Sequence, residues 1–213
     1  MAALKMNCAE SIETVIDYGV ATRPATGETV SGDLYLIKRL EDGVLLAVVD
    51  GVGHGDEALA AALTASLVLE HQADAPLISL IHQCHQALAR TRGAVMTVAR
   101  LNTRESTLTW LGVGNVEGHL FRAEPGSDPS FESVLLRNGL VGGRLPALQA
   151  SVLPLAPDDL LIFATDGIRS GFSDEINRAG TPQQLARRIL HQNFKGNDDA
   201  LVLAVLYHGG TDG

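Results

Sequence analysis

Short apolar runs separated by turn residues dominate the chain, and this pattern is typical of β-strands. The runs Leu34–Arg39 and Val44–Asp50 flank Glu41-Asp42-Gly43, an arrangement that predicts a β-hairpin. Residues Leu160–Thr165 are almost all apolar, which predicts a strand buried on both faces. Turn residues also bound the other predicted strands, Ala94–Leu101, Thr107–Val113, His119–Phe121, Phe131–Leu136, Ser151–Leu153 and Leu201–Tyr207.

Three segments instead show the composition or the period of α-helices. Residues 56–70 are rich in Ala and Leu, and Pro76 is followed by apolar residues that share one helical face as far as Leu88. Thr181 and Pro182 predict the N-cap and first turn of a helix that ends near Gln192. Because most strands follow one another without an intervening helix, antiparallel pairing is favoured over βαβ crossovers. The pattern therefore predicts an α+β fold with two sheets and helices outside them.

Composition and charge narrow the possible classes of protein. The 213 residues fit a single domain spanning 1–213, and 46% of them are hydrophobic, enough to build a core. Only 4% are aromatic, so Leu, Val and Ala must fill most of the interior. The formal net charge of −9 argues against nucleic acid and anionic membrane surfaces as partners, because both are negatively charged themselves.

The chain shows no sequence signal for export or membrane insertion. Residues Met1–Glu10 include no apolar segment of the kind that secretory leaders carry, and no apolar run approaches the ~20 residues that span a bilayer. The two cysteines, Cys8 and Cys84, cannot supply a disulfide framework. We therefore expect a soluble, cytoplasmic protein with reduced thiols.

Acidic residues recur beside Gly or a second acid near the ends of apolar runs. They occur in Ser31-Gly32-Asp33, in VDGVGHG from Val49, in ATDG from Ala164 and in GNDD from Gly196. Carboxylate oxygens are the ligands that Mg²⁺ and Mn²⁺ prefer, and Gly lets a backbone carbonyl approach a metal or its water. A single Asp-Gly pair is most often a simple turn. The repeated pattern favours a divalent metal site over four unrelated turns.

The ordered motifs DGVGHG, GVGNVEG, FATDGIRSGF and NDDALVLAVL, which begin at Asp50, Gly112, Phe163 and Asn197, resemble the PPM superfamily of metal-dependent protein phosphatases. Within it, they are most similar to the SpoIIE-like bacterial branch, and the resemblance extends from about Ser31 to Tyr207. It implies hydrolysis of phosphoserine or phosphothreonine in proteins. It also implies an αββα sandwich of two antiparallel sheets flanked by helix pairs.

The resemblance assigns roles to individual residues. It implies that Asp50 bridges two Mn²⁺ or Mg²⁺ ions, that Gly51 offers its backbone carbonyl, and that Asp166 binds the second ion. The remaining metal residues that it implies are Asp198 as the last ligand, Asp199 as its neighbour, and Asp33 acting directly or through water. Asp50, Asp166 and Asp198 would thereby support attack of a metal-activated water on phosphorus, without a covalent phosphoenzyme.

In three respects the sequence departs from the eukaryotic members of the family, so some of their residue roles do not apply to this chain. Asp166 and Asp198 are 32 positions apart, too close to contain the long flap subdomain of many eukaryotic relatives. The Arg of the eukaryotic phosphate-binding motif has no match, because Arg23 lies ten positions before Asp33. The general-acid histidine of those relatives follows Asp-Gly directly, whereas His54 comes four residues after Asp50.

Several other motifs have plainer interpretations. We interpret His54 mainly as a structural residue and His82-Gln83-Cys84-His85 as an ordinary helical segment, because no second ligand pair is nearby. Asn115, with Gly112 and Gly114, is interpreted as part of a strand-end turn. Arg137 and Arg144 flank a Gly-rich loop that is either solvated or part of a docking surface for a phosphoprotein.

The resemblance also implies partners. Phosphorylated STAS-domain proteins of a bacterial stress-signalling complex, the stressosome, are the expected substrates. A phosphatase of a free anti-anti-sigma factor is an alternative within the same enzyme class. A catalytically inactive PPM domain that acts as a binding module is a different alternative, and the presence of every acid of the metal set argues against it.

Overall fold

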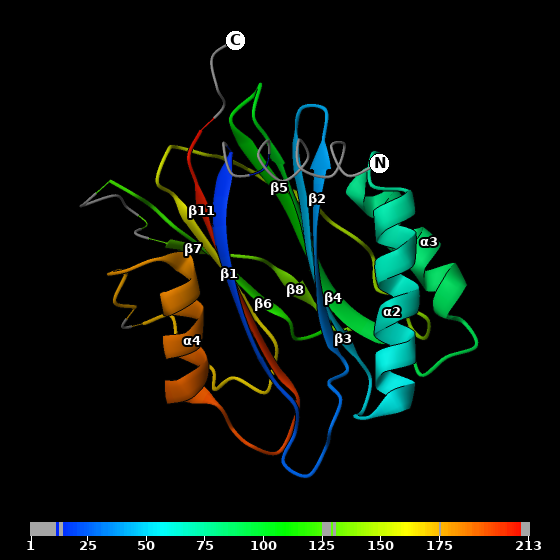
Figure 1. The fold of residues 1–213 in the computed structure, drawn as a ribbon. Coiled ribbons are helices and arrows are strands. Elements are labelled where there is room, and N and C mark those ends of the chain that lie inside the picture. Colours follow the sequence, from blue (N-terminus) through cyan, green and yellow to red (C-terminus); the bar gives the residue numbers. More distant parts are fainter. Residues whose placement is uncertain (1–11, 13–14, 125–128, 130, 175, 210–213) are drawn as a thin grey trace, which may run out of the picture.

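Two β-sheets packed face to face form the centre of the computed structural model, which describes residues 12, 15–124, 129, 131–174 and 176–209 (Figure 1). The first sheet has the order β1 (Ile16–Arg23), β11 (Ala200–Tyr207), β10 (Leu160–Ala164), β6 (Glu117–Phe121) and β7 (Phe131–Ser133). The second has the order β2 (Asp33–Leu40), β3 (Gly43–Gly51), β4 (Ala94–Asn102), β5 (Thr107–Val113) and β8 (Leu136–Arg137), with β9 (Ser151–Pro154) also paired to β5. The predicted α+β fold with two sheets is confirmed.

Strand β3 is an uninterrupted apolar run because both of its faces are covered by other parts of the molecule. It pairs with β2 on one side, from Asp33↔Asp50 to Leu40↔Gly43, and with β4 on the other. Successive side chains of a strand point to opposite faces. Val44, Leu46 and Val48 accordingly enter the core between the sheets, together with Trp110 and Phe163. The alternate residues Leu45, Ala47 and Val49 face the helices. Both faces of β3 are therefore buried.

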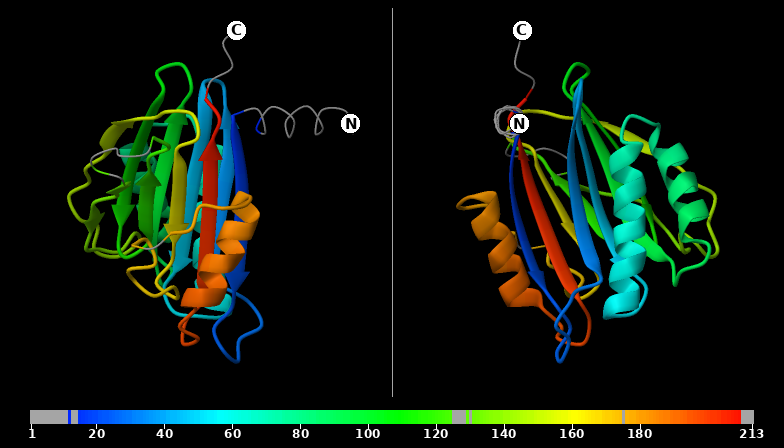
Figure 2. Two further views of the ribbon diagram at one scale, coloured as in Figure 1. Left: turned by 90° about the vertical axis from the view of Figure 1, so that its left-hand side faces the viewer. Right: turned by 45° about the vertical axis from the view of Figure 1, so that its right-hand side comes forward.

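Helices cover the outer faces of both sheets (Figure 2). Helices α2 (Asp56–His71) and α3 (Leu77–Leu88) pack against the second sheet. Helix α4 (Pro182–Asn193) covers the first sheet and begins with a capping box between Thr181 and Gln184. The family resemblance implied a pair of helices on this sheet. Within the described residues, one helix, α4, packs there. None of the helices in the described ranges combines the length and apolar composition needed to cross a bilayer.

One strand was missed in the sequence analysis, and two others were joined into one. Strand β1 was not predicted, because Asp17 and Gly19 interrupt its apolar pattern, yet it pairs with β11 along its full length. The segment Phe131–Leu136 was predicted as one strand, but it passes from one sheet to the other. Strand β7 pairs with β6, whereas Leu136 lies beside Gly112 in a parallel pairing of β8 with β5. The sheets are therefore antiparallel except at β8.

Helix α4 lies very close to β1. A Cβ added to Gly19 would be 2.1 Å from the backbone of Gln183, so only glycine fits. The side chain of Gln183 accepts the Val20 N–H at 3.2 Å and donates to the Val20 carbonyl at 2.7 Å. The end of α4 then leads into the segment that precedes β11. The Gly19 contact thus helps to set the position of that segment.

We expect Gly19→Ala to destabilise the protein by about 1–3 kcal/mol, because the new methyl group must push α4 away from β1. Thr22→Ala, at an exposed position of the same strand, serves as the control and should change stability by no more than about 0.5 kcal/mol. Denaturant unfolding of the two variants checks this. Equal stability of both variants would contradict the close packing of α4 on β1.

Candidate active site

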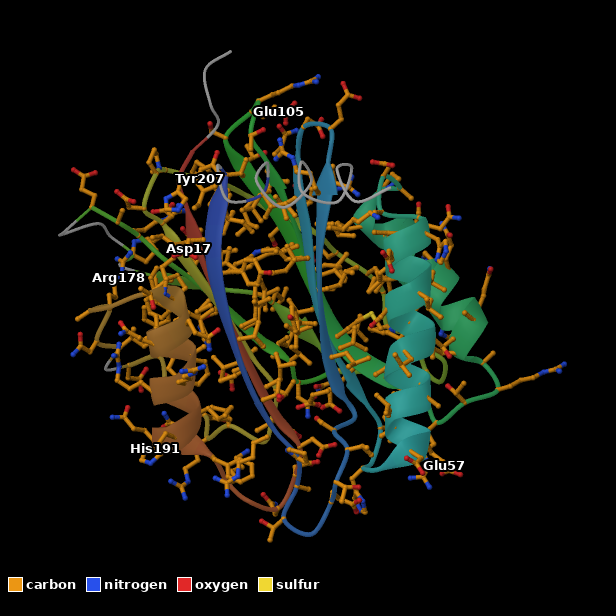
Figure 3. The ribbon with its side chains drawn as sticks, viewed as in Figure 1. Asp17, Glu57, Glu105, Arg178, His191 and Tyr207 are labelled. Carbon is orange, nitrogen blue, oxygen red and sulfur yellow. The ribbon has the colours of Figure 1, made fainter. Side chains whose placement is uncertain are left out.

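Acidic residues from both sheets meet at one end of the sandwich. Asp33 begins β2 and lies opposite Asp50 near the end of β3. Asp166 follows β10, and Asp198 precedes β11, which is paired with β10. This end of the molecule is the one where Glu57 and His191 are labelled in Figure 3, and Glu105 and Tyr207 lie at the opposite end. The topology therefore gathers the four motifs that the sequence pointed to.

A threonine links the acids of the two sheets. The hydroxyl of Thr165 donates to Asp33 Oδ2 at 2.7 Å and accepts the backbone N–H of Leu201 at 2.8 Å. Thr165 and Asp33 are both buried, and only 4% of Asp33 is exposed. The Asp33 carboxylate is thereby fixed against the strand ends of the other sheet. The sequence interpretation did not single out Thr165, although it belongs to the ATDG motif.

Asp199 is engaged by the backbone of the loop before β2. Its Oδ1 accepts the N–H of Ala25 at 2.8 Å, and its Oδ2 accepts the N–H of Gly32 at 2.7 Å. The residue is 3% exposed. Satisfied buried carboxylates of this kind hold backbone segments in place. This geometry favours an anchoring role, and a ligand role for Asp199 stays a prediction.

Asp166 is contacted from two segments that are distant in sequence. The side-chain amide of Asn115 donates to Asp166 Oδ2 at 2.7 Å. The ammonium of Lys195 donates to the Asp166 main-chain carbonyl. Asn115 therefore does more than form the strand-end turn to which the sequence interpretation assigned it. Its place within GVGNVEG, one of the motifs that carry the family resemblance, was the available signal.

The glycines after Asp50 and Asp166 are required by close packing. A Cβ on Gly51 would lie 2.0 Å from the carbonyl oxygen of Ala58, in α2. A Cβ on Gly167 would lie 2.0 Å from the carbonyl oxygen of Asp199. Each Asp-Gly pair therefore lets another segment approach the acidic residue. The use of the Gly51 carbonyl as a metal ligand stays a prediction.

Burial, and to a lesser degree mutual repulsion, shifts the pKa values of these acids. Burial raises the pKa of Asp50 to about 9, and the charges of Asp33, Asp166 and Asp198 add to the effect. Burial also raises the pKa of Asp33 to about 7, partly offset by the hydrogen bond from Thr165. The pKa of Asp166 is raised by burial and by Asp198. These carboxylates cannot all be ionised at neutral pH unless cations balance their charge; otherwise some of them bind protons.

The donor chemistry of this cluster fits a hard divalent cation. The groups that meet are carboxylate oxygens, with neither a thiol nor an imidazole among the residues that shift the pKa of Asp50. Within the described ranges, however, no three His, Cys, Asp or Glu side chains are already arranged as a ready-made ligand set. The strand pairing brings the acids to one end of the sandwich, and the individual metal contacts stay predictions.

The other candidate ligands lie in ordinary structural contacts. His54 Nδ1 is 2.7 Å from Glu28 Oε1 at an exposed position. His85 Nδ1 accepts the backbone N–H of Gly142 at 3.0 Å and so holds the Gly-rich loop against α3. Cys84 is buried, and burial raises the pKa of its thiol to about 12. These contacts support the interpretation of His82-Gln83-Cys84-His85 as an ordinary helical segment.

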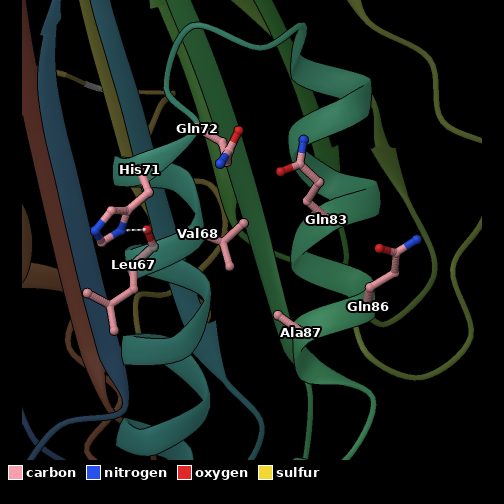
Figure 4. Close-up of a pocket in the computed structure, with 7 residues that line it drawn as sticks. All are labelled: Leu67, Val68, His71, Gln72, Gln83, Gln86 and Ala87. Carbon is pink, nitrogen blue, oxygen red and sulfur yellow. Dashed lines mark hydrogen bonds between the residues drawn. The ribbon is translucent and has the colours of Figure 1, made fainter.

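Figure 4 shows a groove between α2 and α3. It lies at the C-terminal end of α2, whereas Gly51, next to Asp50, packs against Ala58 near the N-terminal end of that helix. Among the described residues that line the groove, His71 Nδ1 forms a hydrogen bond with the Leu67 carbonyl at 2.7 Å. The lining residues are otherwise apolar or amide-bearing: Leu67, Val68, His71, Gln72, Gln83, Gln86 and Ala87. None of these described residues carries a carboxylate, so the groove does not share the chemistry of the acidic cluster.

Comparisons with known proteins agree with this architecture. A family model described as Stage II sporulation protein E (SpoIIE) matches residues 41–208. The phosphoserine phosphatase RsbX of Bacillus subtilis (strain 168) is 26% identical over 142 residues, which cover 67% of this chain and 69% of RsbX.

Two solved structures extend the agreement to the fold. One, from "The bacterial stressosome: a modular system that has been adapted to control secondary messenger signaling", has a TM-score of 0.81 at 30% identity and covers 89% of this chain and 98% of that chain. RsbX in complex with magnesium has a TM-score of 0.78 at 23% identity, with 91% and 96% covered. Since the family match spans most of the sequence and includes three of the four acidic motifs, the chain belongs to the SpoIIE family of PPM phosphatase domains.

Proposed function

We propose that this chain is a divalent-metal-dependent phosphatase that acts on phosphoserine or phosphothreonine of STAS-domain proteins in a bacterial stress-signalling complex. The observation that carries the proposal is the convergence of Asp33, Asp50, Asp166 and Asp198 at one end of the sandwich, where burial and mutual repulsion raise the pKa of three of them, Asp33, Asp50 and Asp166. The similarity to the phosphoserine phosphatase RsbX and to a stressosome structure supports the reaction and the setting. A magnesium complex of RsbX supports the class of metal.

In this proposal the acids of the chain hold the metal ions and the other polar residues orient the acids. Asp50, Asp166 and Asp198 would hold two Mg²⁺ or Mn²⁺ ions, with the Gly51 carbonyl as a further ligand and Asp33 beside them. Bound ions of this class activate water as a nucleophile and neutralise charge on a phosphoryl group. Thr165 fixes Asp33, and Asn115 fixes Asp166, before substrate binds. Such preorganisation lowers the cost of reaching the transition state.

The alternatives differ in substrate or in activity. A free anti-anti-sigma factor would present the same phosphoserine chemistry outside a large complex. An inactive binding module would not need a full set of acids, and the four that converge here would destabilise it without benefit. The four converging acids therefore favour an active phosphatase over an inactive binding module.

Incubation of the protein with phosphorylated STAS-domain candidates, in Mn²⁺ or in EDTA, tests the proposal. We expect loss of one phosphate mass only in Mn²⁺, and a decrease of about 100-fold or more in rate for Asp166→Asn and Asp198→Asn. Mass spectrometry of the substrate measures both effects. Full turnover by metal-stripped protein would refute metal dependence, and wild-type rates in either variant at saturating Mn²⁺ would refute that ligand assignment.

The metal-free protein should lose stability as the pH rises. Between about pH 4 and the raised pKa values of Asp33 and Asp50, the folded state binds more protons than the unfolded chain, so the free energy of unfolding falls with pH. We expect a lower melting temperature in EDTA at about pH 8 than at about pH 5.5. Added Mg²⁺ should stabilise the protein more at the higher pH, because ligands must be deprotonated.

Variants connect this pH dependence to the acidic cluster. Asp50→Asn should flatten the pH dependence and raise the melting temperature in EDTA at about pH 8, because it removes a carboxylate from the repulsion. Asp17→Asn, at an exposed position of β1, should keep the wild-type dependence. A metal-free wild type that is equally stable at both pH values would contradict the crowding of buried carboxylates at this end of the molecule.

Substrate choice should depend on a protein surface outside the metal site. The segment between β10 and β11 contains α4 and no flap within its described residues, so we expect an open site that offers few walls to a small ester. The Gly-rich loop lies beside this site, because Gly114 N–H donates to the Arg137 carbonyl next to Asn115. The Arg137 side chain is half-buried and bonded to Gln149, whereas Arg144 is exposed. Arg144 is therefore the better candidate for docking.

We expect a much higher kcat/KM on a phosphorylated STAS-domain protein than on para-nitrophenyl phosphate or a short phosphopeptide, because remote binding energy accelerates only the larger substrate. Arg144→Glu should reduce the rate on the protein substrate about tenfold and spare the small ester. Arg104→Glu is the matched control at the opposite end of the molecule, where Arg104 pairs with Glu41. Equal kcat/KM on the peptide and the folded protein would refute docking while leaving the metal chemistry intact.

A further inference from the structure

Lys195 is held directly against the turn that carries Asp166. Its backbone N–H donates to the Gly167 carbonyl at 2.9 Å, and its ammonium donates to the Asp166 main-chain carbonyl. The preceding residue, Phe194, pairs with Ile168 as an isolated β-bridge. The backbone bridge and the ammonium contact thus fix Lys195 at the acidic end, although the residue is exposed.

The ammonium is free to bind a further anion. A lysine ammonium has three N–H donors, and one of them contacts the Asp166 carbonyl. That bond leaves the Asp166 carboxylate to Asn115 and to any metal. No described carboxylate forms an ion pair with Lys195 within 4 Å. Two donors therefore remain for a negatively charged ligand.

Three other basic residues at this end of the molecule are already engaged. Arg92 forms an ion pair with Glu57, and His54 contacts Glu28. The Arg23 guanidinium lies 4.5 Å from the centre of the Phe194 ring. Burial and Asp198 raise the pKa of Asp166, and the positive charge of Lys195 lowers it again. Among the described residues that influence this pKa, Lys195 is the cation. It is thus the described cation with the most direct contact to the acidic cluster.

We propose that Lys195 binds the phosphoryl oxygens of the substrate beside Asp166. In the sequence analysis no residue was found for this role, because no arginine precedes Asp33 at a suitable distance. The inference rests on the proposed function. The ammonium would add a charge-assisted hydrogen bond to a group whose negative charge is spread over several oxygens. Its attachment to the Asp166 turn keeps the bound phosphate close to the residues that would hold the metal.

Two variants and one control test this role. Lys195→Met removes the charge and keeps the length of the side chain, and Lys195→Arg keeps the charge. Lys38→Met makes the same change at a lysine on β2 that pairs with Glu70. Titration calorimetry of inorganic phosphate in Mg²⁺ gives the phosphate affinity without turnover, and para-nitrophenyl phosphate gives kcat and KM.

We expect Lys195→Met to weaken phosphate binding and to lower kcat/KM by about 10- to 100-fold. Lys195→Arg should retain most of both, and Lys38→Met should match wild type. Magnesium affinity of Lys195→Met should be unchanged or tighter, because a positive charge beside the site is lost. Unchanged phosphate affinity in Lys195→Met, no phosphate binding by wild type, or weaker magnesium binding in the variant would overturn the role. A wild type without metal-dependent hydrolysis would instead refute the proposed function.

Discussion

Repulsion among carboxylates confined to one end of a β-sandwich is the constraint on which the rest of this structure depends. The hairpin of β2 and β3 sets Asp33 opposite Asp50, and neighbouring strands of the other sheet bring Asp166 and Asp198 to the same end. Burial makes the repulsion more severe, as the raised pKa values of Asp33 and Asp50 indicate. The fold must therefore hold these groups in place by other means.

Those means are packing and directional hydrogen bonds from outside the cluster. The two faces of β3 are buried in separate cores, so Asp50 extends from a strand that has little freedom to move. Thr165 and Asn115 orient individual carboxylates across long stretches of sequence. Asp199, with both oxygens bonded to backbone N–H groups, fastens the loop before β2. Packing and hydrogen bonds thus offset the repulsion among the carboxylates and keep them close together, as is usual at functional sites.

How far the sequence predicts this arrangement depends on whether the signal is local. The apolar run of β10 is a local signal, and it correctly predicted a strand buried on both faces. Strand β1 was missed because Asp17 and Gly19 interrupt its pattern, and the reason for Gly19 is a helix far along the chain. Asn115 was interpreted as a turn residue, since its contact with Asp166 bridges 51 positions. The acids could be located from motifs, whereas the residues that orient them required the tertiary structure.

The amide of Gln183 has a consequence for self-association. Strand β1 lies at the edge of its sheet, and exposed edge strands can pair with strands of other molecules. Gln183 occupies both hydrogen-bonding groups of Val20, so a helix side chain takes the place that an incoming strand would need. Near the middle of β1 the edge is closed by the molecule itself. An aliphatic residue at position 183 would reopen this edge, and β-sheet aggregation would become easier without any change at the acidic end.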